Sequence, residues 1–397
     1  MCASLNLIQD QGIQKIYADY AATSPLDPSV ARALQKDLET LGVDVGNPSS
    51  THASGRKART RMEEAREKIA HYCGKKSAHV LFTSGATESN NIVLQSYKGP
   101  VCVGDTEHDS VRMVRSDAVA LPVHQDGTLD LNYLEDFLKT EKEPPLVAVM
   151  AANNETGVIH PLGEIFDLCE SYGAKTHVDS VQAVGKVPVE FYNRAATFTV
   201  SAHKIGGLSG IGVLVFNPSY PPQPLFRGGG QERNLRPGTE NLLGILSLMY
   251  ALEVIGSHDW ESVQSVRDAF EEKILSLVPK HHHLWTIMGK NAARLPHMSN
   301  VVMPFVKSAV QHIFFDQHNI SVSFGAACSS GKVTKSHVLK AMHVPEEYES
   351  CALRLSFGPK ITMKDMENII DVWKKLYHQH NQKGMMDPSL AQERIIL

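Results

Sequence analysis

The amino-acid sequence predicts an α/β protein with a large domain built on a mostly parallel seven-stranded sheet and a small α+β domain after it. Between residues 79 and 216, short apolar runs rich in β-branched residues alternate with segments of helical spacing. This alternation is typical of parallel strands joined by helices. Further along, long helices are separated by isolated strands. The length of 397 residues suits one large and one smaller domain.

Seven strands are expected in the first region, because each apolar run is short and is bounded by turn-forming residues or helix starts. These runs are residues 79–83, 101–104, 119–123, 146–152, 174–179, 197–202 and 212–216. Helical spacing between them predicts helices at 131–139 and 161–172. Upstream, the charged segment 54–72 predicts a surface helix that ends near Gly74.

The C-terminal part predicts a different arrangement of elements. Long helices are expected at 241–255 and 260–277, the second leading out of the large domain, and a final amphipathic helix at 363–378. Strands are expected at 300–304, 320–323 and 352–357. We therefore expect a large domain at 15–256, a small domain at 257–380 and a tail at 381–397. The first residues, up to roughly residue 25, are expected to pack on the small domain.

Composition excludes several classes of protein. The 39 basic and 43 acidic residues give a net charge of −4 without a Lys/Arg stripe, so nucleic-acid binding is not expected. No apolar stretch approaches the roughly 18 residues that a membrane-spanning helix needs. Residues 1–17 lack the basic start and apolar block of a secretory signal. We therefore expect a cytoplasmic protein that does not bind a membrane directly.

The cysteines and histidines do not predict a metal site. The six cysteines are scattered along the chain: Cys2, Cys73, Cys102, Cys169, Cys328 and Cys351. Because no CxxC pair or Cys/His cluster is present, neither a zinc site nor a disulfide framework is expected. The triplet at residues 281–283 (HHH) is expected to lie in a solvated loop.

Three polar motifs each follow a predicted strand. Residues 84–89 (SGATES) open a helix, whose N-terminus favours an anion such as phosphate, although the motif also suits an ordinary tight turn. Asp179 lies at a strand end, where ligands bind in α/β sheets, but it also suits a helix N-cap. Lys204 precedes a glycine-rich turn that would leave its amine in a cleft, although most lysines lie on the surface. Together the three motifs match what pyridoxal phosphate requires: a phosphate cradle, a carboxylate for the ring nitrogen and a Schiff-base lysine.

At this point the chain resembles a known family. Eleven motifs occur in family order: 17–23 (YADYAAT), 46–50 (GNPSS), 82–90 (FTSGATESN), 107–108 (EH), 153–157 (NNETG), 177–179 (HVD) with Gln182, 201–204 (SAHK), 228–233 (GGGQER), 236–241 (RPGTEN), 325–328 (GAAC) and 354–356 (RLS). This order is similar to that of NifS/IscS-like cysteine desulfurases, in the class V aminotransferase superfamily. The resemblance covers roughly residues 15 to 378 and implies the fold type I of pyridoxal phosphate enzymes.

The resemblance implies cofactor roles for the matching residues. Lys204 would form the Schiff base and Asp179 would pair with the pyridinium nitrogen. Gln182 would hydrogen-bond the ring hydroxyl oxygen, while His108 would stack on the ring and serve as a candidate acid and base.

The resemblance also implies ligands for the phosphate and the substrate. The phosphate would be held by Ala86, Thr87, Ser201 and His203, together with Thr239 from the neighbouring subunit. That contact makes a homodimer the expected assembly. Asn154 and Arg354 would bind the substrate carboxylate, for which the planar guanidinium suits a bidentate pair.

Cys328 distinguishes the possible activities. Its small, glycine-bounded surroundings at residues 323–331 (SFGAACSSG) suit a mobile loop that delivers a nucleophile, although an unplaced cysteine is more often a small buried residue. A thiolate is the attacking form, and Arg233 or Arg236 would lower its pKa if they approach it. The family likeness implies that Cys328 takes sulfur from L-cysteine as a persulfide, releases L-alanine and passes the sulfur to an acceptor protein of unknown identity.

Three alternatives stay open on sequence alone. Selenocysteine lyase uses the same residues and prefers selenium. A class V aminotransferase needs the lysine and the aspartate but no thiol. A subunit that keeps the fold only to dock partners would bind no cofactor on Lys204. The pathway that receives the sulfur, whether iron–sulfur clusters, tRNA thiolation or another, is not fixed by the sequence.

Overall fold

A computed structural model of the chain describes residues 15–41, 46–188, 193–324 and 335–386. Its largest sheet contains β2 (Val80–Thr83), β3 (Val101–Gly104), β4 (Val119–Leu121), β5 (Leu146–Met150), β6 (Lys175–Asp179), β7 (Thr197–Ser201) and β8 (Gly212–Phe216). The spatial order is β2-β8-β7-β6-β5-β3-β4. β8 is antiparallel to both neighbours, and the other four pairs are parallel. The predicted mostly parallel seven-stranded sheet is confirmed.

Helices accompany these strands in the large part of the fold. They are α1 (Pro28–Leu41), α2 (Ala53–Tyr72), α3 (Ala86–Ser96), α4 (Asp109–Arg112), α5 (Leu131–Thr140), α6 (Leu162–Ser171) and α7 (Leu242–Ile255), with the 3-10 turns η1 (Ser77–His79), η3 (Ala202–Lys204) and η4 (Gln231–Asn234). Side-chain caps fix several starts: Asp130 accepts from the N–H of Tyr133 in α5, and Asn241 accepts from that of Gly244 in α7. α1 was not among the predicted helices.

The surface location expected for residues 54–72 is wrong for one face of α2. Ala58, Met62, Ala65 and Ile69 are buried, and they recur at helical spacing along the side that packs against α7. The many charged residues of α2 conceal this narrow apolar stripe, because small alanines supply half of it.

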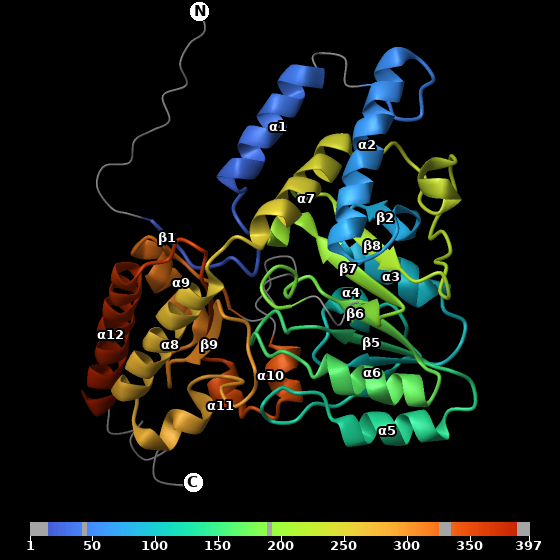
Figure 1. Ribbon diagram of the computed structural model, residues 1–397. Helices are drawn as coiled ribbons and strands as arrows, with labels where there is room; N and C mark the ends of the chain where they lie inside the picture. The colour runs from blue at the N-terminus through green and yellow to red at the C-terminus, as the bar shows by residue number, and fades with distance from the viewer. Residues whose placement is uncertain (1–14, 42–45, 189–192, 325–334, 387–397) are drawn as a thin grey trace, which may run out of the picture.

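The C-terminal part contains α8 (Trp260–Leu277), η5 (Lys280–Trp285), β9 (Met298–Val302), α9 (Ser308–Gln317), β10 (Ile320–Ser321), α10 (His337–Ala341), α11 (Glu346–Glu349), β11 (Ala352–Ser356) and α12 (Met363–Met386). β9 and β11 are antiparallel. The short strand β1 (Ile16–Tyr17) pairs in parallel with β10, so the start of the described chain joins this part. Figure 1 shows α8, α9 and α12 gathered on one side of the molecule and the seven-stranded sheet on the other.

The structure also tests the expectations for the histidine triplet and for membrane-spanning helices. The histidine triplet is not a solvated loop throughout: it lies in η5, where His282 is buried and its Nδ1 lies 2.9 Å from the hydroxyl of Tyr348. Among the described residues no single helix is long and apolar enough to cross a membrane, although α7 and α8 pass that test as a pair bent by 75°.

The strand directions bring three segments to one edge of the sheet. β6 and β7 are parallel neighbours, so Asp179 and Ser201 end at the same edge. β8 reverses direction between β7 and β2, so β2 runs parallel to β7 and also ends there. The turn before α3, Asp179 and the start of η3 therefore lie together, at the edge where α/β sheets bind ligands.

A buried ion pair holds the segment before α7 against β2. Arg66 of α2 and Glu232 of η4 are bonded through two pairs of atoms, at 2.5 and 2.8 Å, and both side chains are almost fully buried. Glu232 also accepts from the N–H of Phe82, and Arg66 donates to the carbonyl of Val80. Glu232 keeps a positive φ of 46°, a conformation that needs such support in a residue other than glycine.

We predict that Glu232→Gln destabilises the fold strongly, because it removes the buried counter-charge of the Arg66 guanidinium and leaves only the exposed carboxylate of Glu63, 3.1 Å from its Nε. Breaking a buried pair from one side costs about 3–5 kcal/mol. The midpoint of urea unfolding, followed by circular dichroism, should fall clearly. Lys68→Ala is the matched control, since its ion pair with Glu253 is exposed and such pairs contribute little. Equal midpoints for the two variants would contradict the prediction.

Buried histidines make the fold sensitive to acid. Burial lowers the pKa of His160 to about 4, and that of His177 likewise to about 4. Burial also lowers the pKa of His297 well below its usual value, and neither ring nitrogen of His297 has a hydrogen-bond partner among the described residues. Each ring is therefore held neutral in the folded protein.

We predict that the stability contributed by these neutral histidines is complete above about pH 6.5 and is lost as the pH drops from there towards 4. In that window the unfolded chain binds protons that the folded protein excludes. The free energy of unfolding therefore falls by up to about 1.4 kcal/mol per pH unit for each histidine. Melting temperatures measured from pH 7.5 to 5 test this. His160→Gln removes one contribution, so its curve should be flatter than the wild-type curve, and parallel curves would refute the explanation.

Candidate active site

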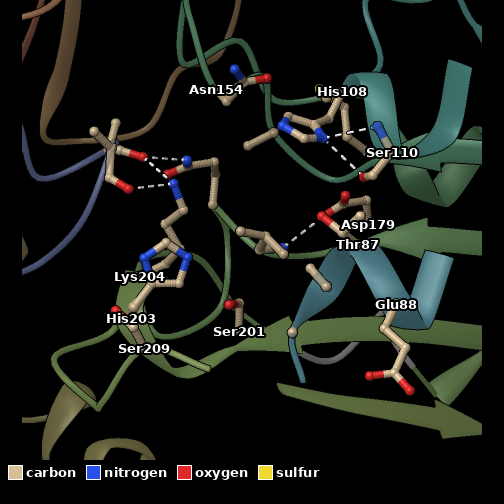
Figure 2. A pocket seen from close by; sticks show the side chains of 18 of the residues that line it. Thr87, Glu88, His108, Ser110, Asn154, Asp179, Ser201, His203, Lys204 and Ser209 are labelled. Atoms are coloured by element: carbon tan, nitrogen blue, oxygen red, sulfur yellow. Dashed lines mark hydrogen bonds between the residues drawn. The ribbon is translucent and has the colours of Figure 1, made fainter. Parts of the chain in front are cut away.

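A cavity of about 490 Å³ opens at this edge of the sheet. It is lined by ten of the residues singled out from the sequence: Ala86, Thr87, His108, Asn154, Asp179, Gln182, Ser201, His203, Lys204 and Arg354. Figure 2 shows Lys204 and His203 on one side of it, with His108, Asn154 and Asp179 across from them. Residues from five strand ends and from the C-terminal part of the fold thus meet in one space.

Lys204 reaches the cavity from η3, directly after β7. Its Nζ donates to the carbonyls of Ala21 and Ala22, at 2.7 Å each. Its own carbonyl accepts from the hydroxyl of Ser24 at 3.0 Å. The segment after β1 therefore holds both the backbone and the amine of Lys204.

A second lysine lies behind the first. The buried Nζ of Lys186 donates to the carbonyls of Gln182 and Lys204, at 3.3 and 3.2 Å. Burial, and then the nearby charge of Lys204, lower the pKa of Lys186 to about 7. Lys186 thus ties the turn after β6 to the turn after β7, and sequence reasoning did not single it out.

Asp179 presents a nearly buried carboxylate at the end of β6. Its Oδ1 accepts from the N–H of Val181 at 3.0 Å, and its Oδ2 accepts from Asn90 Nδ2 at 2.9 Å. The neighbouring Glu107 is fully buried, and burial together with the charge of Asp179 raises its pKa well above the usual value. Glu107 is therefore neutral, and Asp179 carries the negative charge at this end of the cavity.

His108 caps α4 at the opposite wall. Its Nδ1 accepts from the N–H of Ser110 at 3.1 Å and lies 2.9 Å from the Ser110 hydroxyl. Figure 2 shows the ring between Ser110 and the interior of the cavity. One nitrogen is thus bound to protein, and the ring stands across from Lys204.

The first turn of α3 suits an anion. Gly85 precedes it, no side chain caps the helix, and a Cβ added at Gly85 would meet nothing within 4 Å. Open space therefore lies before N–H groups that favour negative charge. Thr87, Ser201 and His203 line the same space; burial and the Lys204 charge lower the pKa of His203 to about 4.

The charge of Glu88 is directed away from this anion site. Its carboxylate accepts from the N–H of Ser84 at 2.6 Å and pairs with Arg236 at 2.9 Å. Burial alone would raise the pKa of Glu88, but these hydrogen bonds lower it. Glu88, the acidic residue in the first turn of α3, is therefore paired with Arg236 and does not occupy the anion site at the N-terminus of the helix.

These residues fit pyridoxal phosphate. The cavity holds an amine, a carboxylate, an imidazole and an uncapped helix N-terminus. The buried Oε1 of Gln182 has no partner in the part of the chain that the structure describes, while its Nε2 donates to the carbonyl of Ala21 at 2.9 Å. An unsatisfied buried oxygen beside the carboxylate is expected where a bound group completes the hydrogen bonding.

Arg354 enters the cavity from β11. Its guanidinium pairs with Asp19 Oδ1 at 2.8 Å and donates to the carbonyl of Asn154 at 2.9 Å. Its Nε is buried without a partner among the described residues. The arginine is thus fixed at the cavity by both parts of the fold, and Asp19 was not anticipated.

Of the predicted site residues that the structure describes, one does not line the cavity. Thr239 is exposed in the segment between η4 and α7. Cys328 lies outside the described residues. The four described cysteines, Cys73, Cys102, Cys169 and Cys351, are all buried, and burial raises the pKa of every one, to about 12 for Cys73 and Cys169. Each of these four thiols is therefore a poor nucleophile.

Sequence reasoning missed residues that act through the backbone or through a second residue. The carbonyls of Ala21 and Ala22 bind the amine of Lys204, and Asn90 binds Asp179. All three lie inside motifs that carried the resemblance, 17–23 and 82–90. Motif membership was the available signal, but a backbone carbonyl has no residue-type signature.

Comparisons with known proteins agree with this geometry. The family model for class-V aminotransferases matches residues 16–369. The cysteine desulfurase IscS of Dictyoglomus turgidum is 34% identical, over 91% of this chain and 94% of that protein. The cysteine desulfurase of Cereibacter sphaeroides is also 34% identical, over 92% of this chain and 97% of that protein.

A solved structure extends the likeness to three dimensions. The NifS-like protein from Rickettsia africae aligns with a TM-score of 0.82 at 31% identity, covering 92% of this chain and 100% of that chain. The family match spans most of the chain, and its members depend on pyridoxal phosphate, which the cavity fits. The chain belongs to the class-V aminotransferase family.

Proposed function

We propose that this protein is a pyridoxal phosphate-dependent cysteine desulfurase. The observation that carries the proposal is the meeting of Lys204, Asp179 and His108 in one cavity with Arg354 at its side, in a chain whose curated relatives are named cysteine desulfurases. The substrate is L-cysteine, and the net reaction moves its sulfur to the thiol of Cys328, giving a persulfide and L-alanine.

In this proposal the cavity residues divide the work of holding the cofactor. Asp179 would pair with the ring nitrogen, Gln182 would hydrogen-bond the ring hydroxyl, and the amine of Lys204 would bond to the aldehyde carbon. The phosphate would be held at the start of α3 by Ala86 and Thr87, with Ser201 and His203 lining the same space, and Asn154 lines the cavity as a further contact for the cofactor. When bound, pyridoxal phosphate supplies a cationic ring that withdraws electrons from the α-carbon of the amino acid.

The chain's own groups then bind the substrate and move protons. Arg354 and Asn154 hold the carboxylate of cysteine. The Nζ of Lys204, held between two backbone carbonyls, takes a proton and returns it to the product carbon.

Cys328 supplies the nucleophile in this proposal. The two described ends of the chain around it are fixed beside the cavity: Ser323 pairs with Arg354 through two backbone bonds, and the Ser336 hydroxyl donates to Glu155, next to Asn154. Cys328 is five positions after Ser323 in the sequence. The burial of the four described thiols adds support, because none of them is poised to react.

The proposal includes a homodimer, a domain division and sulfur acceptors. Thr239 is exposed, so it remains available to complete the phosphate site of a second copy. Residues 15–256 would form the large domain and 257–380 the small one. The persulfide would pass to acceptor proteins, of which iron–sulfur cluster assembly and tRNA thiolation are the candidate users.

Mass spectrometry after a brief incubation of the protein with L-cysteine tests the activity. We predict that the peptide containing Cys328 gains the mass of one sulfur atom and that alanine forms. Cys328→Ser should form no persulfide while keeping the cofactor absorbance, and Cys351→Ser is the matched control that keeps both. Unmodified Cys328 with continued amino transfer would favour an aminotransferase, and turnover of selenocysteine alone would favour a lyase. Either result overturns the proposal.

A mixing experiment tests the shared site. Lys204→Ala removes the reacting amine, and Thr239→Ala weakens the phosphate site contributed to the partner. In a mixed dimer one site carries both substitutions and the other carries neither, so we predict about half of the wild-type activity from two nearly inactive parents. Tagged subunits purified in tandem provide the mixed dimer. Activity no higher than that of the parents would show that each chain completes its own site.

A further inference from the structure

A chain of buried hydrogen bonds joins Asp179 to His108 behind the cavity wall. Asn90 of α3 lies at its centre: its Nδ2 donates to Asp179 Oδ2 and to Ser110 Oγ, at 2.9 Å each. Its Oδ1 lies 2.9 Å from Nε2 of His177, whose Nδ1 lies 2.8 Å from the hydroxyl of Thr197. The Ser110 hydroxyl continues the chain to His108 Nδ1.

The donor and the acceptor in each of these hydrogen bonds can be assigned, because some of the groups can only donate and others can only accept. The Asp179 carboxylate only accepts, so the NH₂ group of Asn90 must face it and the amide oxygen must face His177. Nε2 of His177 therefore carries a hydrogen. His177 is neutral, because burial lowers its pKa to about 4, so its Nδ1 accepts from the hydroxyl of Thr197.

The same logic fixes the proton on His108. The second hydrogen of the Asn90 amide is donated to Ser110 Oγ, which leaves the hydroxyl hydrogen of Ser110 for His108 Nδ1. The backbone N–H of Ser110, which can only donate, points at the same nitrogen. Two hydrogen-bond donors, the hydroxyl and the backbone N–H of Ser110, thus point at His108 Nδ1. A hydrogen on Nδ1 would face the hydrogen of that N–H group, so Nδ1 is the ring nitrogen without a hydrogen.

We propose that Asn90 and Ser110 are positioning residues that keep His108 neutral, with its hydrogen on Nε2, so that it serves the cavity as a hydrogen-bond donor and not as an imidazolium. The inference rests on the proposed function for its chemical meaning. A neutral imidazole held in this way polarises a bound group through Nε2–H. Proton transfer is then left to Lys204. Within the described ranges, the other titratable or charged side chains that line the cavity are Glu88, Asp179, His203, Lys204 and Arg354.

Nitrogen NMR of the holoenzyme, labelled with ring-¹⁵N histidine and free of cysteine, tests the proton position directly. The His108 signals are assigned by their loss in His108→Gln. We expect Nδ1 to resonate as an unprotonated nitrogen and Nε2 as a protonated one, from pH 8 down to pH 6. A protonated Nδ1 in the wild-type protein at pH 7.5 overturns the proposal, whatever any variant does.

Variants of Ser110 test whether its hydroxyl causes that state. Ser110→Ala removes one donor to Nδ1, so the Nδ1-protonated fraction should rise and kcat should fall about tenfold, the lower end of the loss when a histidine loses its supporting partner, with KM for cysteine changed less. Ser110→Thr keeps the hydroxyl and should restore both readouts. Ser299→Ala, which removes a buried hydroxyl from Glu271 outside the cavity, is the matched control and should leave both unchanged.

The two proposals fail separately. If no persulfide forms but the His108 spectrum is as expected, the desulfurase activity is wrong and the proton assignment stands. If Ser110→Ala leaves the His108 signals and kcat at wild-type values, Ser110 does not set the proton position, and this inference is refuted even when persulfide formation is normal.

Discussion

The direction of three strands is the constraint on which the rest of this structure depends. Because β8 runs against both β7 and β2, the ends of β2, β6 and β7 meet at one edge of the sheet. The start of α3, the carboxylate of Asp179 and the amine of Lys204 are carried by those three ends. A loop can adjust where each group points, but only the strand directions put an anion site, an acid and an amine in the same space.

Burial then decides which groups at that edge carry charge. Glu107, His177 and His203 have pKa values shifted towards their neutral forms by loss of water. Among the described residues that line the cavity, the formal charges are therefore those of Asp179, Lys204 and Arg354, together with Glu88, which Arg236 neutralises. A site with few fixed charges in a low-dielectric surrounding gives each of them a large effect on a bound cationic ring.

The sequence predicted the elements better than the contacts between them. Alternating apolar runs placed all seven strands of the large sheet, because β-branched segments bounded by turns have few other structures available. The prediction of exposure was wrong for two polar segments. One face of α2, which includes Ala58 and Ala65, is buried despite the many charged residues of the helix, and His282 is buried against Tyr348. The sequence also predicted the residues that line the site, but not the residues that hold them in place. The roles of Ala21, Asn90 and Lys186 depend on hydrogen bonds between segments distant in sequence.

The two parts of the fold meet through the residues that would bind the substrate carboxylate. Arg354 lies on β11, pairs with Asp19 after β1 and donates to the carbonyl of Asn154. Asn300, its neighbour on β9, donates to the carbonyl of Glu155 in the same loop. The loop at 153–157 is thus bonded to both strands of the small sheet. A change in how the two parts sit would therefore move Arg354 and Asn154 together, which keeps the guanidinium and the amide matched to one carboxylate.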